Sequence, residues 1–453
     1  MAKKKQALSP EERLAAALVP EEEWPYALPN GWKWVYLGEI TTIVGGGTPS
    51  SRCPEYYDDG KIPWITPADL SDYNEVYISH GRRNITQLGL EKSSAKLMPE
   101  NTVLLSSRAP IGYVAIAAND ICTNQGFKSF LPSIHFIPEY LYWFLKGNQA
   151  LLQQYASGTT FLELSSRRAS EIKLPIPPLS EQRRLVARIE SLFAKLDAAR
   201  EKVQSVLDSH ETRKAALLHD AFTGKLTAKW REEHQTELRE IKQFPSKLKS
   251  APNHVDALAG KWALVRLGDV ITWSSGGTPS RKHPEYYSGD IPWVKTGELN
   301  NTYIYDTSEK ITKEAIAQSS AKVLPVNTVL LAMYGATIGK VGILGVEAAT
   351  NQACACGICS EWVDYRFLFY YLQSQKSSFI CSGKGGAQPN ISQTIIKQYE
   401  FPLPSLPEQQ EIIRILGRLL AREQRARQAA EETLTVIDRM KQAILARAFR
   451  GEL

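Results

Sequence analysis

The sequence lacks any long apolar run, and cysteine is scarce. Among 453 residues there are 6 Cys and 4 Met, and no stretch approaches the roughly 18 apolar residues that a membrane-spanning helix needs. Residues 1–5 (MAKKK) lead into polar sequence, so we expect no secretory signal. Six scattered cysteines in a chain of this size do not indicate a disulfide framework. We therefore expect a soluble, cytoplasmic protein without membrane contact.

Signatures of catalysis are missing as well. Residues 335–341 (GATIGKV) are one residue short of a phosphate-binding loop and lack its Ser or Thr, so we predict a turn between strands. The tetrapeptides Asn-Pro-Pro-Tyr and Asp-Pro-Pro-Tyr, with which amino-methylating enzymes hold a flipped adenine, do not occur. The 7 His lack the H-E-x-x-H spacing of zinc peptidases. The sequence therefore favours a binding protein, with no enzyme activity and no cofactor of its own.

What the chain does contain is a long internal repeat. The segments TNQ at 123–125, PIPPLSEQ at 175–182 and FTGKL at 222–226 return as TNQ, PLPSLPEQ and FRGEL, each 227 residues later (123 to 350, for example). GGTPS at 46–50 and PEYY at 54–57 return at 276–280 and 284–287. This period is far longer than the 20–50 residues of a solenoid repeat, so it indicates a duplicated domain.

Each copy of the repeat has two parts. Short strand-like runs, bounded by Pro, Gly and Asn, predict a mixed domain at 32–180 and another at 262–407. A helical region follows each domain, at 181–226 and 408–453, where apolar residues recur at alternating steps of three and four. Residues 1–31 are an N-terminal extension, and residues 227–261 a charged linker. The apolar seam comprises Leu185, Ile189, Leu192, Leu196, Val203, Ile412, Leu416, Leu419, Ile437 and Met440.

The seams determine the expected fold. A lone helix of this kind would expose its seam, so we expect the two helices to pack antiparallel, as a coiled coil roughly 60 Å long with a domain at each end. The alternative is a solvent-exposed connector that packs on its own domain. The predicted class is α+β, with two similar mixed α/β domains joined by two long antiparallel helices and related by a pseudo-twofold internal repeat.

One cysteine cluster leaves a metal site open as an alternative. On a strand, Cys354 and Cys356 face one side and Cys359 the other. The matching residues of the first copy are Phe, Ser and Pro, which cannot bind metal. We therefore favour buried structural residues over a zinc or iron–sulfur site.

The formal net charge of +6 is too small to indicate a nucleic-acid-binding protein. Residues 32–180 carry 13 basic and 13 acidic residues, and residues 262–407 carry 12 and 11. The helical regions at 181–226 and 408–453 each carry 9 basic and 7 acidic residues. Charge alone therefore does not predict DNA binding by the two domains.

Taken together, these motifs resemble the specificity (S) subunits of type I restriction–modification systems. The likeness runs from a tryptophan-rich lead (GWKWVYLG at 31–38) to residue 453. It is carried by GGTPS with PEYY, by the two P-x-P-x-x-x-E-Q helix starts and by the two F-x-G-x-L helix ends, because both copies hold all of them in register.

The resemblance implies a non-catalytic role in a larger complex. Each domain would be a target recognition domain that reads one half of a bipartite, asymmetric double-stranded DNA sequence, and the helices would fix the distance between the halves. Two modification (M) subunits, which bind S-adenosylmethionine and methylate adenine, would dock against the helical seam. Restriction (R) subunits, which use ATP and magnesium, would join to cleave DNA.

Candidate DNA-contacting residues are polar groups in loops that differ between the copies. Arginine can read guanine, and Gln or Asn can read adenine, through paired hydrogen bonds, although a turn or a solvated surface would also suit each of them. In the first domain they are Thr48, Ser50, Arg52, Arg82, Arg83, Ser107, Arg108, Thr160, Arg167 and Arg168. In the second they are Thr278, Ser280, Arg281, Lys282, Lys295, Tyr334, Lys384, Gln388 and Asn390.

Two other functions compete with DNA recognition. Low domain charge and an abundance of Trp and Tyr also suit a non-catalytic scaffold that binds protein or glycan. A self-contained restriction–methylation enzyme is disfavoured because the methylase and nuclease motifs are missing.

Overall fold

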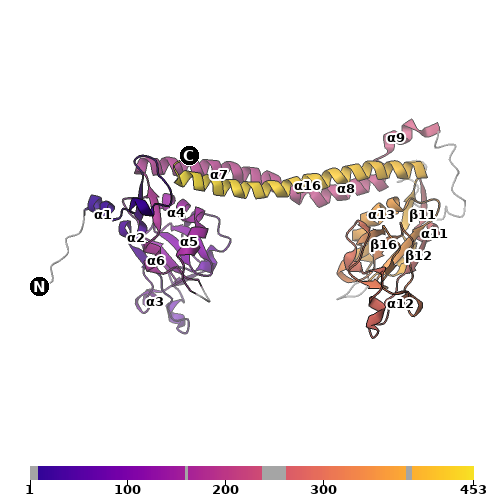
Figure 1. The fold of residues 1–453 in the computed structure, drawn as a ribbon, viewed down its shortest axis with the longest axis horizontal. Coiled ribbons are helices and arrows are strands. Elements are labelled where there is room, and N and C mark those ends of the chain that lie inside the picture. The colour runs from indigo at the N-terminus through magenta and orange to yellow at the C-terminus, as the bar shows by residue number, and fades with distance from the viewer. Residues whose placement is uncertain (1–8, 159–161, 237–261, 384–389) are drawn as a thin grey trace. The chain divides into compact units, whose positions relative to one another are not determined.

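The computed structural model describes residues 9–158, 162–236, 262–383 and 390–453 (Figure 1). The chain divides into two compact units: unit 1 is Met1–Val203 with Glu432–Leu453, and unit 2 is Gln204–Glu431. Each unit therefore contains one of the two predicted domains, the start of the helical region that follows it, and the end of the other helical region. No described helix is both long and apolar enough to cross a membrane.

Unit 1 is built on three small sheets. A five-stranded sheet has the order β2-β9-β6-β7-β4, a three-stranded sheet has the order β5-β3-β8, and β1 pairs with β10. The pairs β4/β7 and β3/β8 are parallel and the others antiparallel. The strands are β1 (Lys33–Tyr36), β2 (Ile43–Gly45), β3 (Ile62–Ile65), β4 (Tyr77–Ile78), β5 (Arg83–Ile85), β6 (Val103–Ser107), β7 (Ile111–Ala117), β8 (Cys122–Thr123), β9 (Phe127–Phe130) and β10 (Lys173–Ile176).

Unit 2 repeats this topology strand for strand, with each label higher by ten. Its sheets have the orders β12-β19-β16-β17-β14 and β15-β13-β18, and β11 pairs with β20. The predicted duplication and mixed α/β class are therefore confirmed. The strands are β11 (Ala263–Arg266), β12 (Ile271–Ser275), β13 (Ile291–Val294), β14 (Tyr303–Ile304), β15 (Lys310–Ile311), β16 (Val329–Ala332), β17 (Val341–Leu344), β18 (Ala349–Thr350), β19 (Cys354–Cys359) and β20 (Glu400–Leu403).

Helices cover one side of each five-stranded sheet (Figure 1). The 3-10 helix at Gly335–Thr337 occupies the turn between β16 and β17, as predicted for the segment that resembles a phosphate-binding loop. The α-helices are α1 (Pro10–Ala16), α2 (Leu37–Ile40), α3 (Gln87–Glu91), α4 (Pro138–Gly147), α5 (Gln149–Tyr155), α6 (Ser166–Ser170), α7 (Leu179–Asp208), α8 (His210–Phe222), α9 (Ala228–Glu233), α11 (Leu267–Val270), α12 (Lys313–Ala317), α13 (Tyr365–Ser374), α14 (Lys376–Ser382), α15 (Gln393–Gln398) and α16 (Leu406–Phe449).

The long helices run antiparallel within each unit. In unit 1, Asp197 of α7 binds Lys441 of α16, and Arg184 at the start of α7 donates to the carbonyl of Leu453, 2.7 Å away. In unit 2, Arg213 of α8 binds Glu423 of α16 at 2.8 Å. The first helical region differs from the prediction in one respect: it is interrupted at Ser209, between α7 and α8, whereas α16 is continuous over 44 residues.

A buried glutamine fixes the start of each long helix to its own domain. The Gln182 side chain donates from Nε2 to the carbonyls of His135 (2.9 Å) and Pro177 (3.0 Å) and accepts at Oε1 from the amide of Ile137 (3.0 Å). Gln409 makes the same three bonds in unit 2, and both glutamines are fully buried. These three hydrogen bonds explain the glutamine of the repeated E-Q pair.

The end of each helical region docks on the domain of the other copy. Phe449, at the end of α16, packs edge-on against Tyr140 and Phe144 of α4, with ring centroids 5.1 and 5.3 Å apart. At the equivalent place in unit 2, Phe222 of α8 packs against Phe367 and Tyr371 of α13. Each unit therefore joins the start of one long helix to the end of the other.

The N-terminal extension is part of unit 1. The amide of Val19 donates to the carbonyl of Trp34, and that of Tyr36 donates to Ala17, so the segment lies along β1. The hydroxyl of Tyr26 donates to the carbonyl of Phe449 at 2.9 Å. Burial raises the pKa of Tyr26 to about 12.

Candidate nucleic-acid interface

The GGTPS loop and the three-stranded sheet form the same frame in both units. The loop lies so close to its neighbours that a Cβ on Gly46 would be 2.0 Å from the carbonyl oxygen of Asn124. A Cβ on Gly276 would be 2.1 Å from the carbonyl oxygen of Thr350. Only glycine allows this approach, which explains why both copies keep the pair of glycines.

Two aromatic side chains hold the loop in unit 1. Trp64 of β3 donates from Nε1 to the carbonyl of Gly47 at 2.9 Å, and the hydroxyl of Tyr57 donates to the carbonyl of Pro49 at 2.6 Å. Unit 2 repeats both bonds through Trp293 (3.0 Å) and Tyr287 (2.6 Å). The repeated PEYY motif thus supplies an anchor for the loop, and burial raises the pKa of both tyrosines.

The tip of this frame presents an exposed Thr–Gln pair in each unit. Thr48 bonds to the side chain of Gln125, and Thr278 to that of Gln352. All four residues are exposed. The two threonines were predicted, but the two glutamines were missed. The repeated TNQ segment was the signal that could have found them.

In both units an arginine lies over the PEYY tyrosine that anchors the loop, Tyr57 or Tyr287, but it comes from different positions. In unit 1, the Arg83 guanidinium of β5 lies 4.1 Å from the centroid of Tyr57. In unit 2, Arg281 of the loop lies 4.0 Å from the centroid of Tyr287. Both predicted arginines are therefore exposed cations on an aromatic platform, an arrangement that fixes the plane of the guanidinium.

Unit 2 adds an acidic group to this place. Glu309 binds Lys295 and Arg281 through separate oxygens, each at 2.7 Å. The hydrogen bond from Lys295, with a further one from Arg281, lowers the pKa of the Glu309 carboxyl, so the group is charged at neutral pH. Glu309 was not among the predicted DNA-contacting residues, all of which are cationic, amide or hydroxyl side chains.

The other predicted residues of this region are exposed polar groups around the same frame. Ser50 and Arg52 in unit 1, and Ser280 and Lys282 in unit 2, are exposed at the end of the GGTPS loop. Arg82 has 78% of its side chain exposed and lies 3.9 Å from Asp69. The structure therefore gathers most of the predicted residues at the three-stranded sheet, at the end of each unit away from the long helices (Figure 1).

A second group in unit 1 lies apart from this frame and needs one correction. Ser107 is fully buried at the end of β6, so it cannot contact DNA in this conformation. Arg108 lies 4.0 Å from Glu163, and Arg168 binds Glu171 at 2.6 Å. The predicted residues Thr160, Lys384 and Gln388 lie outside the described residues, as does most of the linker.

The Arg167 side chain is 89% exposed and lies 3.5 Å from Glu171, the residue that follows α6. In unit 2, Tyr334 is 44% exposed and forms an isolated β-bridge with Asn390. This bridge brings together two predicted residues that are far apart in sequence.

The predicted seam residues divide by depth. Leu185, Ile189, Ile412 and Leu416 are fully buried in the chain's own cores, so assigning them to a subunit interface is wrong. They pack against the domains instead. Of the remainder, Ile437 is buried, Met440 is 47% exposed, and the half-buried ones are Leu192, Leu196, Val203 and Leu419.

The cysteine cluster belongs to two cores. Cys354 and Cys356 are fully buried in one apolar cluster, and Cys359 packs against another, so the predicted alternation along the strand is confirmed. Burial raises the pKa of the Cys356 thiol to about 11 and that of Cys359 to about 12. Among the described residues, no group of three His, Cys, Asp or Glu could hold a metal ion.

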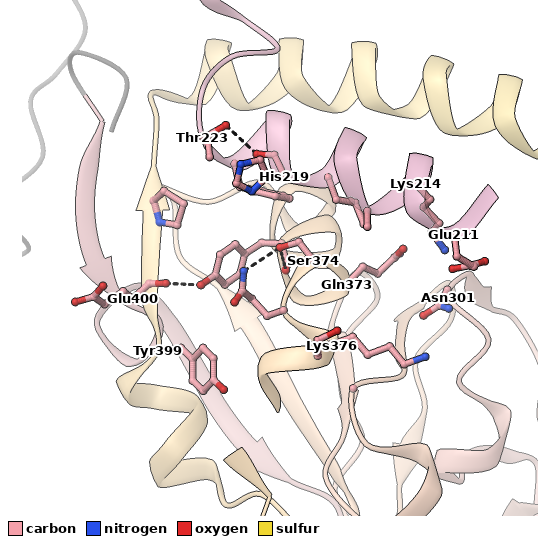
Figure 2. A pocket seen from close by; sticks show the side chains of 18 of the residues that line it. Glu211, Lys214, His219, Thr223, Asn301, Gln373, Ser374, Lys376, Tyr399 and Glu400 are labelled. Atoms are coloured by element: carbon pink, nitrogen blue, oxygen red, sulfur yellow. Dashed lines mark hydrogen bonds between the residues drawn. The ribbon is translucent and has the colours of Figure 1, made fainter. Parts of the chain in front are cut away.

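A cavity of about 870 Å³ lies elsewhere in unit 2, between α8 and the α13–α14 pair. Figure 2 shows Glu211, Lys214 and His219 along its α8 side and Lys376 opposite them. It is at the end of the unit next to the long helices, whereas the loop frame adjoins α12 at the other end (Figure 1). The cavity is therefore separate from the candidate interface.

Comparison with known proteins finds the same family for both copies. Residues 29–207 and 259–432 match the family model described as the type I restriction modification DNA specificity domain. The type I restriction enzyme MjaIX specificity subunit of Methanocaldococcus jannaschii is 28% identical over 432 residues, which are 94% of each chain.

Two solved structures share the fold. One, described by the assembly and conformational transition of a type I R-M system, has a TM-score of 0.69 at 21% identity, and the match covers 95% of this chain and 100% of that one. The other, the HsdS subunit from Thermoanaerobacter tengcongensis, has a TM-score of 0.62 at 20% identity with the same coverage.

Proposed function

The chain belongs to the type I restriction modification DNA specificity family, and we propose that each of its two domains reads one half of a bipartite DNA target. Its role is sequence recognition, and catalysis would lie in other subunits. Recognition of cellular DNA would place the chain in the cytoplasm.

The observation that carries this proposal is one frame with two sets of exposed side chains. Both units keep the glycine loop, the Trp and Tyr anchors and the exposed Thr–Gln pair. Around that frame the charged residues differ: Ser51 and Arg83 in unit 1 stand where unit 2 has Arg281 and Glu309. A duplicated reader of two unequal half-sites needs this combination, because shared groups suit shared DNA features and different groups suit different bases.

The partners follow from the same role. We infer that two modification subunits bind the chain, that they carry S-adenosylmethionine, and that restriction subunits with ATP and magnesium join them. The half-buried seam positions Leu192, Leu196 and Val203, and the exposed Met440, support a contact along the helices, since they leave apolar surface uncovered. Partner subunits would also supply net positive charge for the DNA backbone, since the basic residues of the two domains are nearly balanced by acidic ones.

A domain exchange tests the proposal. Residues 32–180 are replaced by the matching region of a relative with a different target, and the chain is expressed with its modification partners. Sequencing of methylated adenines should then show a new first half-site and an unchanged second one. A change in both halves, or in neither, would contradict independent reading.

Binding measurements separate this function from a scaffold for protein or glycan. The assembled complex should bind the DNA sequence that it methylates with an affinity about 10³-fold or more above that for random DNA, as specific DNA-binding proteins do. The affinity for DNA should also fall steeply as the salt concentration is raised from about 50 to about 200 mM. A complex with neither property would favour the scaffold.

A further inference from the structure

Charged groups around the shared frame differ between the units at the arginine that lies over Tyr57 in unit 1 and over Tyr287 in unit 2. We propose that Arg83 in unit 1, and Arg281 with Glu309 and Lys295 in unit 2, are the residues that set which base each unit reads at this position. The inference rests on the proposed function and deepens it by naming the side chains that determine specificity.

The two sets occupy equivalent positions of the frame. Ser51 and Arg281 directly follow the GGTPS motif in their copies. Ile85 pairs with Ile62, the first residue of β3, and Ile311 pairs with Ile291, the first residue of β13. Arg83 and Glu309 each lie two residues before these paired isoleucines. Lys295 follows β13, where Thr66 follows β3. The residue triplet Ser51, Thr66 and Arg83 therefore corresponds to Arg281, Lys295 and Glu309.

Both triplets carry a net charge of +1, but they arrange it differently. In unit 1 the charge is one guanidinium, held 4.1 Å above the Tyr57 ring. In unit 2 two cations share one carboxylate, and Arg281 lies 4.0 Å above Tyr287 and 5.5 Å from Trp293. If these side chains only attracted phosphate, the net charge alone would matter. The two triplets keep the same net charge but place it on different side chains, and this difference points to contacts with bases.

The geometry suits reading of a base edge. A guanidinium that stacks on an aromatic ring loses little further conformational freedom when it binds, and its planar edge stays available for two parallel hydrogen bonds. Guanine offers the matching pair of acceptors, O6 and N7. In unit 2, Glu309 already accepts from both cations, and a carboxylate can also accept from the amino group of cytosine. We therefore infer that Arg83 reads a guanine and that the unit 2 triplet reads a different base.

The first test uses single substitutions in the full chain, expressed with its modification partners. Arg83→Gln should relax one guanine position in one half-site, with about 5- to 150-fold less discrimination against other bases there. Arg83→Lys keeps the charge but loses the planar fork, so it should relax the same position. The control Lys92→Gln removes a charge from an exposed residue next to α3 and should leave the methylated sequence unchanged.

The second test transplants the triplet. A chain with Arg281→Ser, Lys295→Thr and Glu309→Arg carries the unit 1 arrangement on the unit 2 frame. Its second half-site should change at one position, toward guanine, while the first half-site stays the same. The unaltered half-site reports that the chain folds and assembles.

The outcomes are distinguishable from those of the proposed function. If the unmodified complex methylates a bipartite sequence but the Arg83 variants and the transplant all leave that sequence unchanged, the inference is wrong and the function stands. If Arg83→Lys behaves as wild type while Arg83→Gln weakens binding to every sequence alike, Arg83 contacts phosphate and the inference also fails. If the unmodified complex shows no sequence preference, the proposed function itself is wrong.

Discussion

Replacing the buried glutamine at the start of α7 should loosen unit 1 while the rest of the chain stays folded. Gln182→Leu keeps nearly the same volume but removes all three hydrogen bonds to the segment before α4 and to the end of β10. The carbonyl of Pro177 is then buried without this partner, whereas the groups of His135 and Ile137 are only partly buried and retain some access to water. The effect should therefore come mainly from one fully buried group.

The size of the effect follows from these burial states. A buried polar group left unsatisfied costs about 1–3 kcal/mol, and partly exposed groups cost less, so we expect a total of about 2–4 kcal/mol. In a unit of about 225 residues, each kcal/mol lowers the melting temperature by about 2–4 °C. The transition of unit 1 should fall by roughly 4–16 °C.

Calorimetry and hydrogen exchange measure the two consequences separately. Scanning calorimetry should show the lowered transition, and the amide of Ile137 should lose protection because its acceptor is gone. Gln153→Leu makes the same exchange at an exposed site on α5 and should change the melting temperature little. If Gln182→Leu matched that control in both measurements, the glutamine would not be what fixes the helix to the domain.

Three further perturbations test other contacts. Phe449→Ala should destabilise unit 1 by about 3–5 kcal/mol and leave unit 2 intact, as chemical denaturation followed by limited proteolysis would show; equal loss in both units would contradict it. Arg231→Ala should lower the free energy of unfolding by about 3–5 kcal/mol because Glu408, with 3% of its side chain exposed, loses its cationic partner and keeps the hydroxyl of Thr227; adding Glu408→Gln should restore most of the melting temperature. Under native conditions a maleimide should label the exposed Cys381 and spare Cys354, whose burial raises the pKa of its thiol; rapid labelling of Cys354 detected by mass spectrometry would place it at the surface.

The duplication made most of the fold predictable. Because two copies of one sequence must build two copies of one structure, matching motifs located the domains and the helices together. Alternation on β19 likewise placed Cys354 and Cys356 on the face opposite Cys359. These are local patterns or direct comparisons between the copies.

Features that depend on long-range contacts were less accessible. The fully buried seam positions Leu185 and Leu416 could not be separated from the exposed seam position Met440, because a heptad shows which face is apolar but not what covers it. Next to a domain, the apolar face of each long helix packs into the core of that domain. Farther from the domains, this face is covered only by the other long helix. The interruption at Ser209 carries no Gly or Pro that would have indicated it.

The candidate interface was predicted by residue type more than by role. Arg83 and Arg281 were both named, but their common position above a tyrosine depends on the pairing of β3 with β5 and on the path of the loop. Glu309 was missed since an acidic residue is not an obvious DNA contact; its part emerges only beside Arg281 and Lys295.

Phe449 docks on α4 and Phe222 docks on α13, so the end of each copy in the sequence completes the core of the other copy's domain. A premature stop codon shortly before Phe449 would spare every residue of the first domain, yet it would remove an aromatic side chain from that domain's core. A defect at Phe222, which precedes the whole second domain in the sequence, would damage that domain. Loss-of-function alleles should therefore be assigned to a half-site by the unit they disturb and not by their order along the gene.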